Sequence, residues 1–164
     1  GVISPELARA YAVTGPTLRA SGEDYDLRRD EPYALYPELS LRVATRSQGD
    51  CYARYLVRME ELAASLDLVE QCLERLPAGP VVARGVPQEP APPEGSYYSA
   101  YESARGLVGI YLVSDGSRVP WRLKWRTPSF SNLSVLPALL PGTLVADTIA
   151  ILGSLDLVIP EIDR

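Results

Sequence analysis

Cysteine and histidine, the residues that most often carry nucleophilic catalysis or bind transition metals, are scarce in this sequence. It contains no histidine and two cysteines, Cys51 and Cys72. The lack of histidine excludes Ser-His-Asp and Cys-His catalysis, histidine-ligated metals and a histidine pH switch. The two cysteines fall on one predicted helix, about 31 Å apart at roughly 1.5 Å per residue, whereas a disulfide needs Cα atoms within about 7 Å. We therefore expect neither a disulfide nor a shared metal, and a chain that functions inside the cell.

Neighbouring carboxylates occur at three places, but their spacing does not favour acid–base catalysis. The pairs are Glu23/Asp24, Asp30/Glu31 and Glu60/Glu61. Adjacent residues on a helix do not face each other, so these side chains are expected at the surface. A glycine-rich phosphate loop is also missing, because Gly106 and Gly109 lie in or beside a predicted strand without the fingerprint. The residues alone predict no self-sufficient active site.

Charge and composition narrow the class of partner. The net charge of −5 argues against nonspecific binding of nucleic acid, which depends on neutralising phosphates. Lys124 is the only lysine beside fifteen arginines. Arginine suits buried and interfacial pairing with carboxylates, although a GC-rich genome explains the same bias. No apolar run reaches the roughly 18 residues that span a bilayer. The start shows no signal peptide and no initiator Met, which suggests a fragment, a processed chain or a trimmed one.

The clearest structural pattern is a long amphipathic helix over about 51–76. Apolar side chains recur in alternating steps of three and four at Tyr52, Tyr55, Met59, Leu62, Leu66, Val69, Leu73 and Leu76. Asp50 is placed to cap the helix and Pro77 to end it. A stripe of nearly four heptads needs a partner helix, and no other predicted helix matches it in length. A core helix of a larger bundle is favoured over a free coiled coil, with part of the stripe covered from outside these residues.

We expect an α+β fold in three parts. A helical part spans 1–76, where short helices, including one over the glycine-bracketed stretch 14–22, precede the long helix. A proline-rich linker or surface excursion follows over 77–95, because six prolines make such a segment stiff and extended. A mixed part over 96–164 contains a β-hairpin, short helices and a tail.

The hairpin combines an apolar run over 107–113, a turn over 114–117 and strict alternation from 119 to 126. One face of its second strand carries Val119, Trp121, Leu123 and Trp125, and the other face carries Pro120, Arg122, Lys124 and Arg126. Because the tryptophans lie opposite the basic residues, they cannot interleave with them as in a site for single-stranded nucleic acid. A solvated or interfacial strand face is therefore favoured. Two short helices are then expected, over 132–140 and 143–152.

Short strings spread over nearly the whole chain, outside the proline-rich region, form a specific combination. They are Gly1–Ser4, Thr14-Gly15-Pro16, Leu18–Gly22, Asp26-Leu27-Arg28-Arg29, Gly49-Asp50-Cys51-Tyr52, Arg54–Glu61, Glu102 with Arg105-Gly106, Tyr111–Gly116, Pro128-Ser129-Phe130, Asn132-Leu133, Ala146-Asp147, Ala150–Asp156 and Glu161–Arg164. Together they resemble the C-terminal part of the quinone-site subunit of the proton-pumping NADH:quinone oxidoreductase, respiratory complex I. This 49 kDa-type subunit is related to the large subunit of nickel-iron hydrogenases. The resemblance thus implies the C-terminal part of a hydrogenase-large-subunit-like fold.

The resemblance also implies a function that depends on partners. In the family the old metal cavity has become the quinone headgroup site, beside the subunit that holds the terminal iron–sulfur cluster. This chain is then expected to bind no cofactor itself, with quinone as substrate at the interface and iron–sulfur clusters and FMN in partner subunits of the peripheral arm. It would lie on the cytoplasmic side of the inner membrane, touch the membrane only indirectly, and be inactive in isolation.

The resemblance carries over three site positions. Arg105 and Asp156 resemble a charged pair behind the cavity, and Val158 resembles a wall residue near the quinone. Such a pair can couple quinone reduction to proton movement through its pKa values, and a structural salt bridge is an equal alternative. Hydrogenases have a metal-binding Cys-x-x-Cys where Val158 and Glu161 stand here. Without the soft sulfur ligands, no metal is expected, and an energy-converting hydrogenase subunit is disfavoured.

Several departures from the family pattern keep a second function open. The histidine and tyrosine that contact quinone in the family belong to an N-terminal half outside this sequence. The proline-rich segment is short, without a helix that usually precedes Pro93-Glu94-Gly95. Leu107 replaces a usual glutamate, and Leu157 and Pro160 replace a usual proline and glycine. The alternative function is a degenerate, non-catalytic docking or assembly module of the same family.

Overall fold

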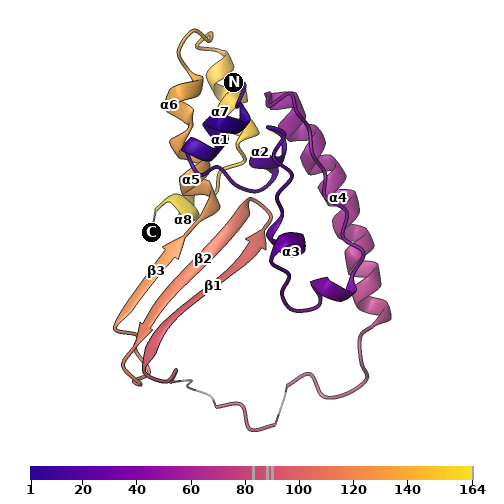
Figure 1. Cartoon of the computed structure of the whole chain (residues 1–164), viewed down its shortest axis with the longest axis vertical. Helices are drawn as coiled ribbons and strands as arrows, with labels where there is room; N and C mark the ends of the chain where they lie inside the picture. Colours follow the sequence, from indigo (N-terminus) through magenta and orange to yellow (C-terminus); the bar gives the residue numbers. More distant parts are fainter. Residues whose placement is uncertain (83, 88, 90, 164) are drawn as a thin grey trace.

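The computed structural model describes every residue except Ala83, Gln88, Pro90 and Arg164. Its helices are α1 (Pro5–Ala10), α2 (Pro16–Arg19), α3 (Leu27–Asp30), α4 (Cys51–Glu74), α5 (Pro128–Ser134), α6 (Leu136–Leu139), α7 (Asp147–Ser154) and α8 (Ile159–Ile162), with a 3-10 turn, η1, at Tyr36–Glu38. Its strands are β1 (Gly95–Ser103), β2 (Gly106–Ser114) and β3 (Arg122–Arg126). Figure 1 shows α4 beside a small sheet, with α1, α5, α6 and α7 gathered at one end. The predicted α+β class is confirmed.

The long helix α4 forms where the apolar periodicity predicts it. Asp50 caps its start by accepting a hydrogen bond from the Ala53 backbone N–H at 2.7 Å, and the helix ends at Glu74, shortly before Pro77. The side that faces the rest of the chain buries Val57 and Leu68. Both cysteines lie on α4 and are free thiols.

The apolar stripe of α4 remains exposed in the described part of the chain. We call its eight side chains the α4 stripe: Tyr52, Tyr55, Met59, Leu62, Leu66, Val69, Leu73 and Leu76. Every one of them is exposed, from 46% for Met59 to 74% for Leu76. The expected exposure of this apolar surface agrees with the structure of the described residues.

The sheet has the order β1-β2-β3 and is antiparallel throughout. The predicted hairpin is β2 with β3, although β3 begins at Arg122 rather than at Val119. Proline has no N–H to donate to a strand partner, which disfavours a strand through Pro120. Strand β1 is an addition to the prediction. It consists of serines, tyrosines and other residues without an apolar alternation, so periodicity does not identify it.

The hydrophobic core lies among the short helices rather than on the sheet. One cluster of buried residues joins α1 to the C-terminal helices and consists of Ile3, Ala8, Val13, Val135, Leu139, Ile151 and Leu155. A smaller cluster packs Ala20 against Ala53 and Val57 of α4. The sheet contributes one fully buried apolar side chain, Val108, among the described residues. Most of the sheet thus extends beyond the core (Figure 1).

The remaining predicted elements are found with shifted bounds. The stretch 14–22 contains α2, the stretch 132–140 contains the end of α5 and all of α6, and α7 overlaps the helix predicted over 143–152. Between α4 and β1 the described residues form no helix or strand. Ala83, Gln88 and Pro90 of the predicted excursion, and Arg164 of the last string, lie outside the described residues. No helix in the described chain is long and apolar enough to cross a membrane.

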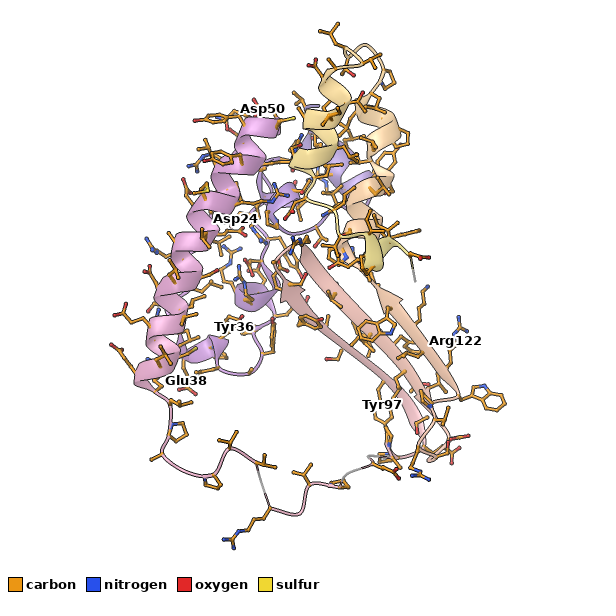
Figure 2. All side chains as sticks on the ribbon, turned by 180° about the vertical axis from the view of Figure 1, so that it is seen from behind. Asp24, Tyr36, Glu38, Asp50, Tyr97 and Arg122 are labelled. Carbon is orange, nitrogen blue, oxygen red and sulfur yellow. The ribbon has the colours of Figure 1, made fainter. Side chains whose placement is uncertain are left out.

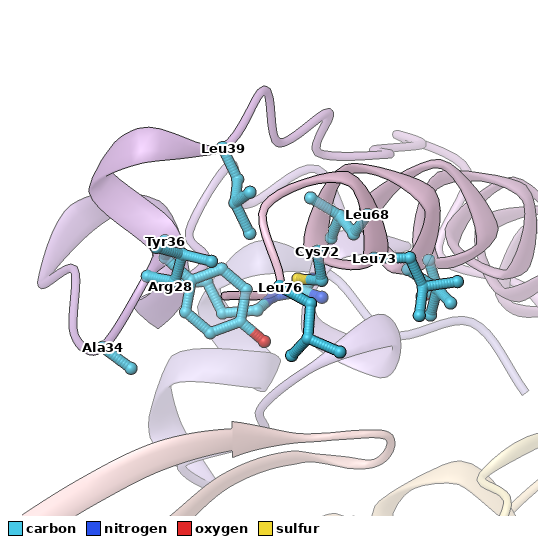
Figure 3. A pocket seen from close by; sticks show the side chains of 11 residues that line it. Arg28, Ala34, Tyr36, Leu39, Leu68, Cys72, Leu73 and Leu76 are labelled. Atoms are coloured by element: carbon cyan, nitrogen blue, oxygen red, sulfur yellow. The ribbon is translucent and has the colours of Figure 1, made fainter. Parts of the chain in front are cut away.

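A groove of about 500 Å³ runs along the C-terminal half of α4 (Figure 3). It is lined by Arg28, Ala34, Leu35, Tyr36, Leu39, Ser65, Leu68, Val69, Cys72, Leu73 and Leu76. Three of these residues, Val69, Leu73 and Leu76, also belong to the α4 stripe. The exposed apolar surface of α4 is therefore continuous with a hollow, which is typical of surfaces that bind partners.

We predict that the isolated chain associates through the α4 stripe. The double variant Leu66→Glu/Leu73→Glu should raise the dissociation constant at least about tenfold, because each leucine loses roughly 1.5–3 kcal/mol of burial in the associated state. Sedimentation velocity over a range of concentrations measures this. The control is Glu70→Gln, on an exposed part of α4 outside the stripe. A wild-type chain that stays monomeric at high concentration would contradict the prediction.

Candidate functional site

The turn between β1 and β2 is pressed against the loop before α2. Gly15 has φ +68°, and a Cβ there would lie 2.5 Å from the Cα of Gly106. Gly106 has φ +129°, and a Cβ there would lie 2.6 Å from Thr14 Cγ2. Only glycine allows both backbones to approach this closely in these conformations. The close contact fixes Arg105, the residue immediately before Gly106.

Asn132 joins three segments around this contact. Its Oδ1 accepts a hydrogen bond from the Thr14 N–H at 3.0 Å, and its Nδ2 donates to the carbonyls of Thr14 and Arg105 at 3.4 and 3.3 Å. Leu107 N–H donates to Thr14 Oγ1 at 3.0 Å. Asn132 is 1% exposed, so these bonds are shielded from water. The backbone of Arg105 is therefore held from β2, from the N-terminal loop and from α5.

Two arginines of α4 hold the end of α7. Arg54 donates from Nε and Nη2 to Ser154 Oγ at 2.9 and 2.8 Å, and Arg58 Nη1 donates to the Ser154 carbonyl at 2.8 Å. Cations near the C-terminus of a helix also interact favourably with its dipole. Burial lowers the pKa of both guanidinium groups. For Arg58, the negative charge of Asp156 opposes that lowering.

Asp156, two residues beyond Ser154, meets two arginines. Its Oδ2 lies 3.2 Å from Arg105 Nε and 3.6 Å from Arg58 Nε, and Arg105 Nη2 donates to its Oδ1 at 3.3 Å. Asp156 has φ +55°, a conformation in which Asp and Asn are the commonest residues after glycine. We call Arg58, Arg105 and Asp156 the Asp156 cluster. The structure brings Arg105 and Asp156 together, while their part in a quinone site stays a prediction.

Val158 is the N-cap residue of α8 and Glu161 lies within that helix, and both are bonded to the start of α5. The Val158 N–H donates to Ser129 Oγ at 3.1 Å. Ser129 in turn donates to the Glu161 carboxylate from its N–H, at 3.1 Å, and from its hydroxyl. Glu161 thus anchors the tail to the first turn of α5 and offers no thiolate. Among the described residues, no group of His, Cys, Asp or Glu side chains is arranged to hold a metal ion.

A second charged group is buried around Arg19, which is 1% exposed. Its Nε donates to Glu61 Oε1 at 2.6 Å, and its Nη1 donates to Glu102 Oε1 at 2.9 Å and lies 3.4 Å from Asp26 Oδ2. Arg28 completes the group by binding Asp26 at 2.6 Å. We call these five residues the Arg19 cluster. They come from α2, α3, α4 and β1, together with Asp26, the N-cap of α3.

Burial and charge act in opposite directions on the acids of the Arg19 cluster. Burial raises the pKa of Glu102, and the positive charge of Arg19 only partly offsets this effect. Burial also acts to raise the pKa of Asp26, but the hydrogen bonds and charge of Arg28 and the charge of Arg19 outweigh it and lower that pKa. Glu102 is thus the acid of this cluster whose charged form is disfavoured.

Sequence reasoning missed the Arg19 cluster, and its surface assignment of Glu61 was wrong. The Glu61 side chain is 15% exposed and is bound to a fully buried guanidinium. The helical rule holds, since Glu60 points elsewhere and pairs with Arg46. The rule considers only residues on the same helix, so it does not anticipate a partner that is distant in the sequence, such as Arg19. The available signals were the excess of arginine and the charges around α3, and neither indicates which residues meet.

The two clusters share one cleft of about 360 Å³. It is lined by Pro16, Arg28, Arg58, Glu61, Leu62, Ser65, Glu102, Ser103, Ala104 and Asp156. Arg28, Glu61 and Glu102 come from the Arg19 cluster, and Arg58 and Asp156 from the Asp156 cluster. A cleft that contains several ionisable groups, among them an acid with a raised pKa, is a candidate site for binding a polar group or moving a proton.

Comparison with known proteins identifies the family to which the chain belongs. The sequence model of a family described as "Respiratory-chain NADH dehydrogenase, 49 Kd subunit" matches residues 1–91 and 84–164. The chain belongs to this family. The resemblance noted in the sequence is thereby confirmed. The two matched stretches overlap in the proline-rich segment, the region excluded from the resemblance.

Similar proteins are subunits of redox complexes. The chain is 54% identical to a NADH-quinone oxidoreductase subunit of Syntrophobacter fumaroxidans and 49% identical to the equivalent protein of Desulfotalea psychrophila. Each comparison covers the whole chain and 44% of the relative, so the chain spans less than half the length of these proteins. A chain in the structure of the membrane-bound sulfane sulfur reductase, an archaeal respiratory membrane complex, superposes with a TM-score of 0.90 at 42% identity. That match covers 100% of this chain and 46% of the other.

The short proline-rich segment is shared with the two bacterial relatives. Their alignments run over 164 positions, which is the length of this chain. Neither relative therefore has extra residues within the aligned stretch. The short segment is therefore not peculiar to this chain.

We predict that Arg19 supports the fold far more than an exposed arginine does. Arg19→Met should lower the free energy of unfolding by about 3–5 kcal/mol, because it leaves buried carboxylates without their cation. The control Arg29→Met removes pairs with Asp24 and Asp30 at the surface and should cost about 0–1 kcal/mol. Urea unfolding followed by circular dichroism measures both. If both variants lose the same free energy of unfolding, the Arg19 cluster stabilises the fold no more than a surface ion pair does.

The raised pKa of Glu102 predicts a pH-dependent stability. The folded state binds the Glu102 proton more tightly than the unfolded state, so unfolding becomes easier as pH rises above about 4.5 towards the folded pKa. The stability of wild type relative to Glu102→Gln should therefore fall between pH 5 and pH 8. Urea titrations at both pH values measure the difference. A wild type that gains stability relative to the variant as pH rises would contradict the sign.

Proposed function

We propose that this chain is the C-terminal part of the quinone-site subunit of a proton-translocating NADH:quinone oxidoreductase. In this function it forms one wall of the quinone headgroup cavity, beside the terminal iron–sulfur cluster of a partner subunit. Family membership over the whole chain and the NADH-quinone oxidoreductase relatives support the assignment. The observation that carries it is the Asp156 cluster, because it pairs the two resemblance-derived charges, Arg105 and Asp156, and Asp156 lines a cleft.

The charges of the Asp156 cluster suit a site of quinone reduction. Two guanidinium groups surround one carboxylate, which leaves a net positive charge. Reduction of a quinone places negative charge on its oxygens before protons arrive, and fixed cations stabilise such charge. Asp156 holds the two cations in place through its contacts with Arg58 and Arg105. Arg105 and Asp156 are therefore proposed to couple quinone reduction to proton movement, with Val158 in the cavity wall.

The chemistry requires groups outside this chain. NADH oxidation needs FMN, and electron delivery needs iron–sulfur clusters, which we assign to partner subunits of the peripheral arm. Quinone is the substrate at the interface, and contact with the membrane is indirect, on the cytoplasmic side. The exposed α4 stripe supports a chain that works only when docked, because subunit surfaces commonly carry large apolar patches. The isolated chain is accordingly proposed to be inactive.

Two other functions have specific support. A degenerate docking module fits the exposed stripe and the loss of a glutamate at Leu107, although the relatives that share the short segment make degeneration less plausible. The other alternative is a subunit of a complex that reduces sulfane sulfur. It is supported by the 42% identity to a chain in the structure of the membrane-bound sulfane sulfur reductase. The higher identity to a NADH-quinone oxidoreductase subunit favours quinone.

A pull-down from source membranes in mild detergent tests the function. The tagged native protein is isolated, and bait and partners are identified by mass spectrometry. Recovery with iron–sulfur and flavin subunits, and reduction of quinone by NADH in the eluate, supports the proposal. Recovery alone or with unrelated soluble proteins favours the docking module. Recovery of a complex that reduces polysulfide and not quinone assigns the sulfur function.

We predict that Asp156→Asn lowers quinone reduction by the assembled complex about a hundredfold, because the site loses an ionisable group between two cations. Asparagine tolerates the positive φ of this position, so the complex should assemble normally. Oxidation of NADH by a soluble artificial acceptor should remain unchanged, because it does not use the quinone site. Asp115→Asn, in an exposed turn, is the control. A normal rate of quinone reduction in Asp156→Asn would assign the pair to structure alone.

A further inference from the structure

A basic groove lies on one face of the sheet, away from the cleft. Arg122, Lys124 and Arg126 alternate along β3, and the strand register places Lys124 beside Tyr111 and Tyr111 beside Tyr98. The groove has a volume of about 420 Å³ and is lined by Tyr98, Gly109, Tyr111, Arg122, Lys124 and Arg126. A Cβ at Gly109 would lie 2.7 Å from the Tyr98 hydroxyl. Glycine here leaves room for the tyrosine to lie across β2.

Two cations of this groove lack an acidic partner. Elsewhere in the part of the chain that the structure describes, nine arginines form ion pairs with carboxylates: Arg9, Arg19, Arg28, Arg29, Arg42, Arg46, Arg58, Arg105 and Arg118. Within the described chain, Arg122 and Lys124 form no ion pair. Arg126 donates to the carbonyls of Leu107 and Ala12 at 2.8 and 3.1 Å, so it is held in place. In a chain of net charge −5, this is a local excess of positive charge on a fixed frame.

The groove borders an open edge of the sheet. β3 pairs with β2 on one side and with no other strand of the described chain. Figure 2 shows Arg122 at the margin of the molecule, on the side away from α4. Side chains two residues apart on a strand are about 6.6–6.8 Å apart. The cations therefore form a row with the period of an extended polypeptide, rather than converging on one point as a phosphate site requires.

We propose that the basic groove binds an extended acidic segment of a partner subunit, whose carboxylates at alternate positions meet Arg122 and Lys124. The hydroxyls of Tyr98 and Tyr111 line the same groove and donate to further carboxylate or carbonyl oxygens. Complementary charge fixes the register of such a segment, and the open edge of β3 provides backbone groups beside it. This inference rests on the proposed function, since it requires a multi-subunit complex.

Lys124 allows a direct test, because it is the only lysine of the chain. A zero-length carbodiimide joins a lysine amine to a carboxylate only at ion-pair distance. Applied to the assembled complex, it should link Lys124 to an Asp or Glu of a partner subunit, as identified by mass spectrometry. Lys124→Arg keeps the charge without the amine, so it should abolish the link and leave the partner bound. Links from Lys124 to this chain's own acids alone, or none at all, would overturn the assignment.

Charge reversal supplies a second measurement. Arg122→Glu/Lys124→Glu should reduce co-purification of the cross-linked subunit about tenfold at physiological salt, because carboxylates would then face carboxylates. Arg84→Glu, an exposed change between α4 and β1, should leave the subunit bound. Unchanged co-purification after charge reversal would overturn the proposal. If no other subunit co-purifies with the wild-type chain, the proposed function is wrong. The inference about the groove, which requires a partner subunit, then fails for that reason and not because of the charges of the groove.

Discussion

The buried guanidinium of Arg19 is the interaction on which the arrangement of this chain depends. A charge that is 1% exposed is tolerated only when its donors are paired with acceptors. Glu61 and Glu102 provide those acceptors from positions 42 and 83 residues further along the chain. The long helix and the first strand must therefore both reach α2. The contact beside the Arg19 cluster is filled by small apolar residues such as Ala20 and Ala53. The orientation of the helix and the strand is therefore set by the ion pairs of Arg19.

The geometry of the Asp156 cluster follows from this constraint. Arg58 is on α4, one turn before Glu61, and Arg105 is just beyond the end of β1, which carries Glu102. Fixing the two glutamates around Arg19 thus brings Arg58 and Arg105 towards each other, and Asp156 bridges them. Because both clusters line one cleft, the charge state of one alters the field at the other. A change of protonation at Glu102 would therefore be felt at Asp156.

The sequence predicts elements whose signal is periodic and fails where the signal depends on distant contacts. The stripe of α4 and the alternation of β3 repeat within one segment, so both elements are identified. Strand β1 lacks such alternation because serines and tyrosines, rather than apolar residues at every second position, make up most of it. The Arg19 cluster has no periodic signature, and the rule that places Glu61 at the surface considers only its own helix. The pairing of Arg105 with Asp156 came from resemblance alone, since no local pattern connects positions so distant in sequence.

Charged groups occupy part of the interior of this chain beside a small apolar core, while many large apolar side chains remain exposed. Ion pairs specify orientation but contribute little net stability, whereas apolar burial is the main source of stability. This chain buries arginines and exposes a stripe of eight apolar side chains. It therefore leaves much of the stabilisation available from apolar burial unused. Burying the stripe against another surface would supply the missing stability. Leu62 belongs to the stripe and also lines the cleft beside Arg58 and Asp156, so a surface docked on the stripe would border the charged site directly.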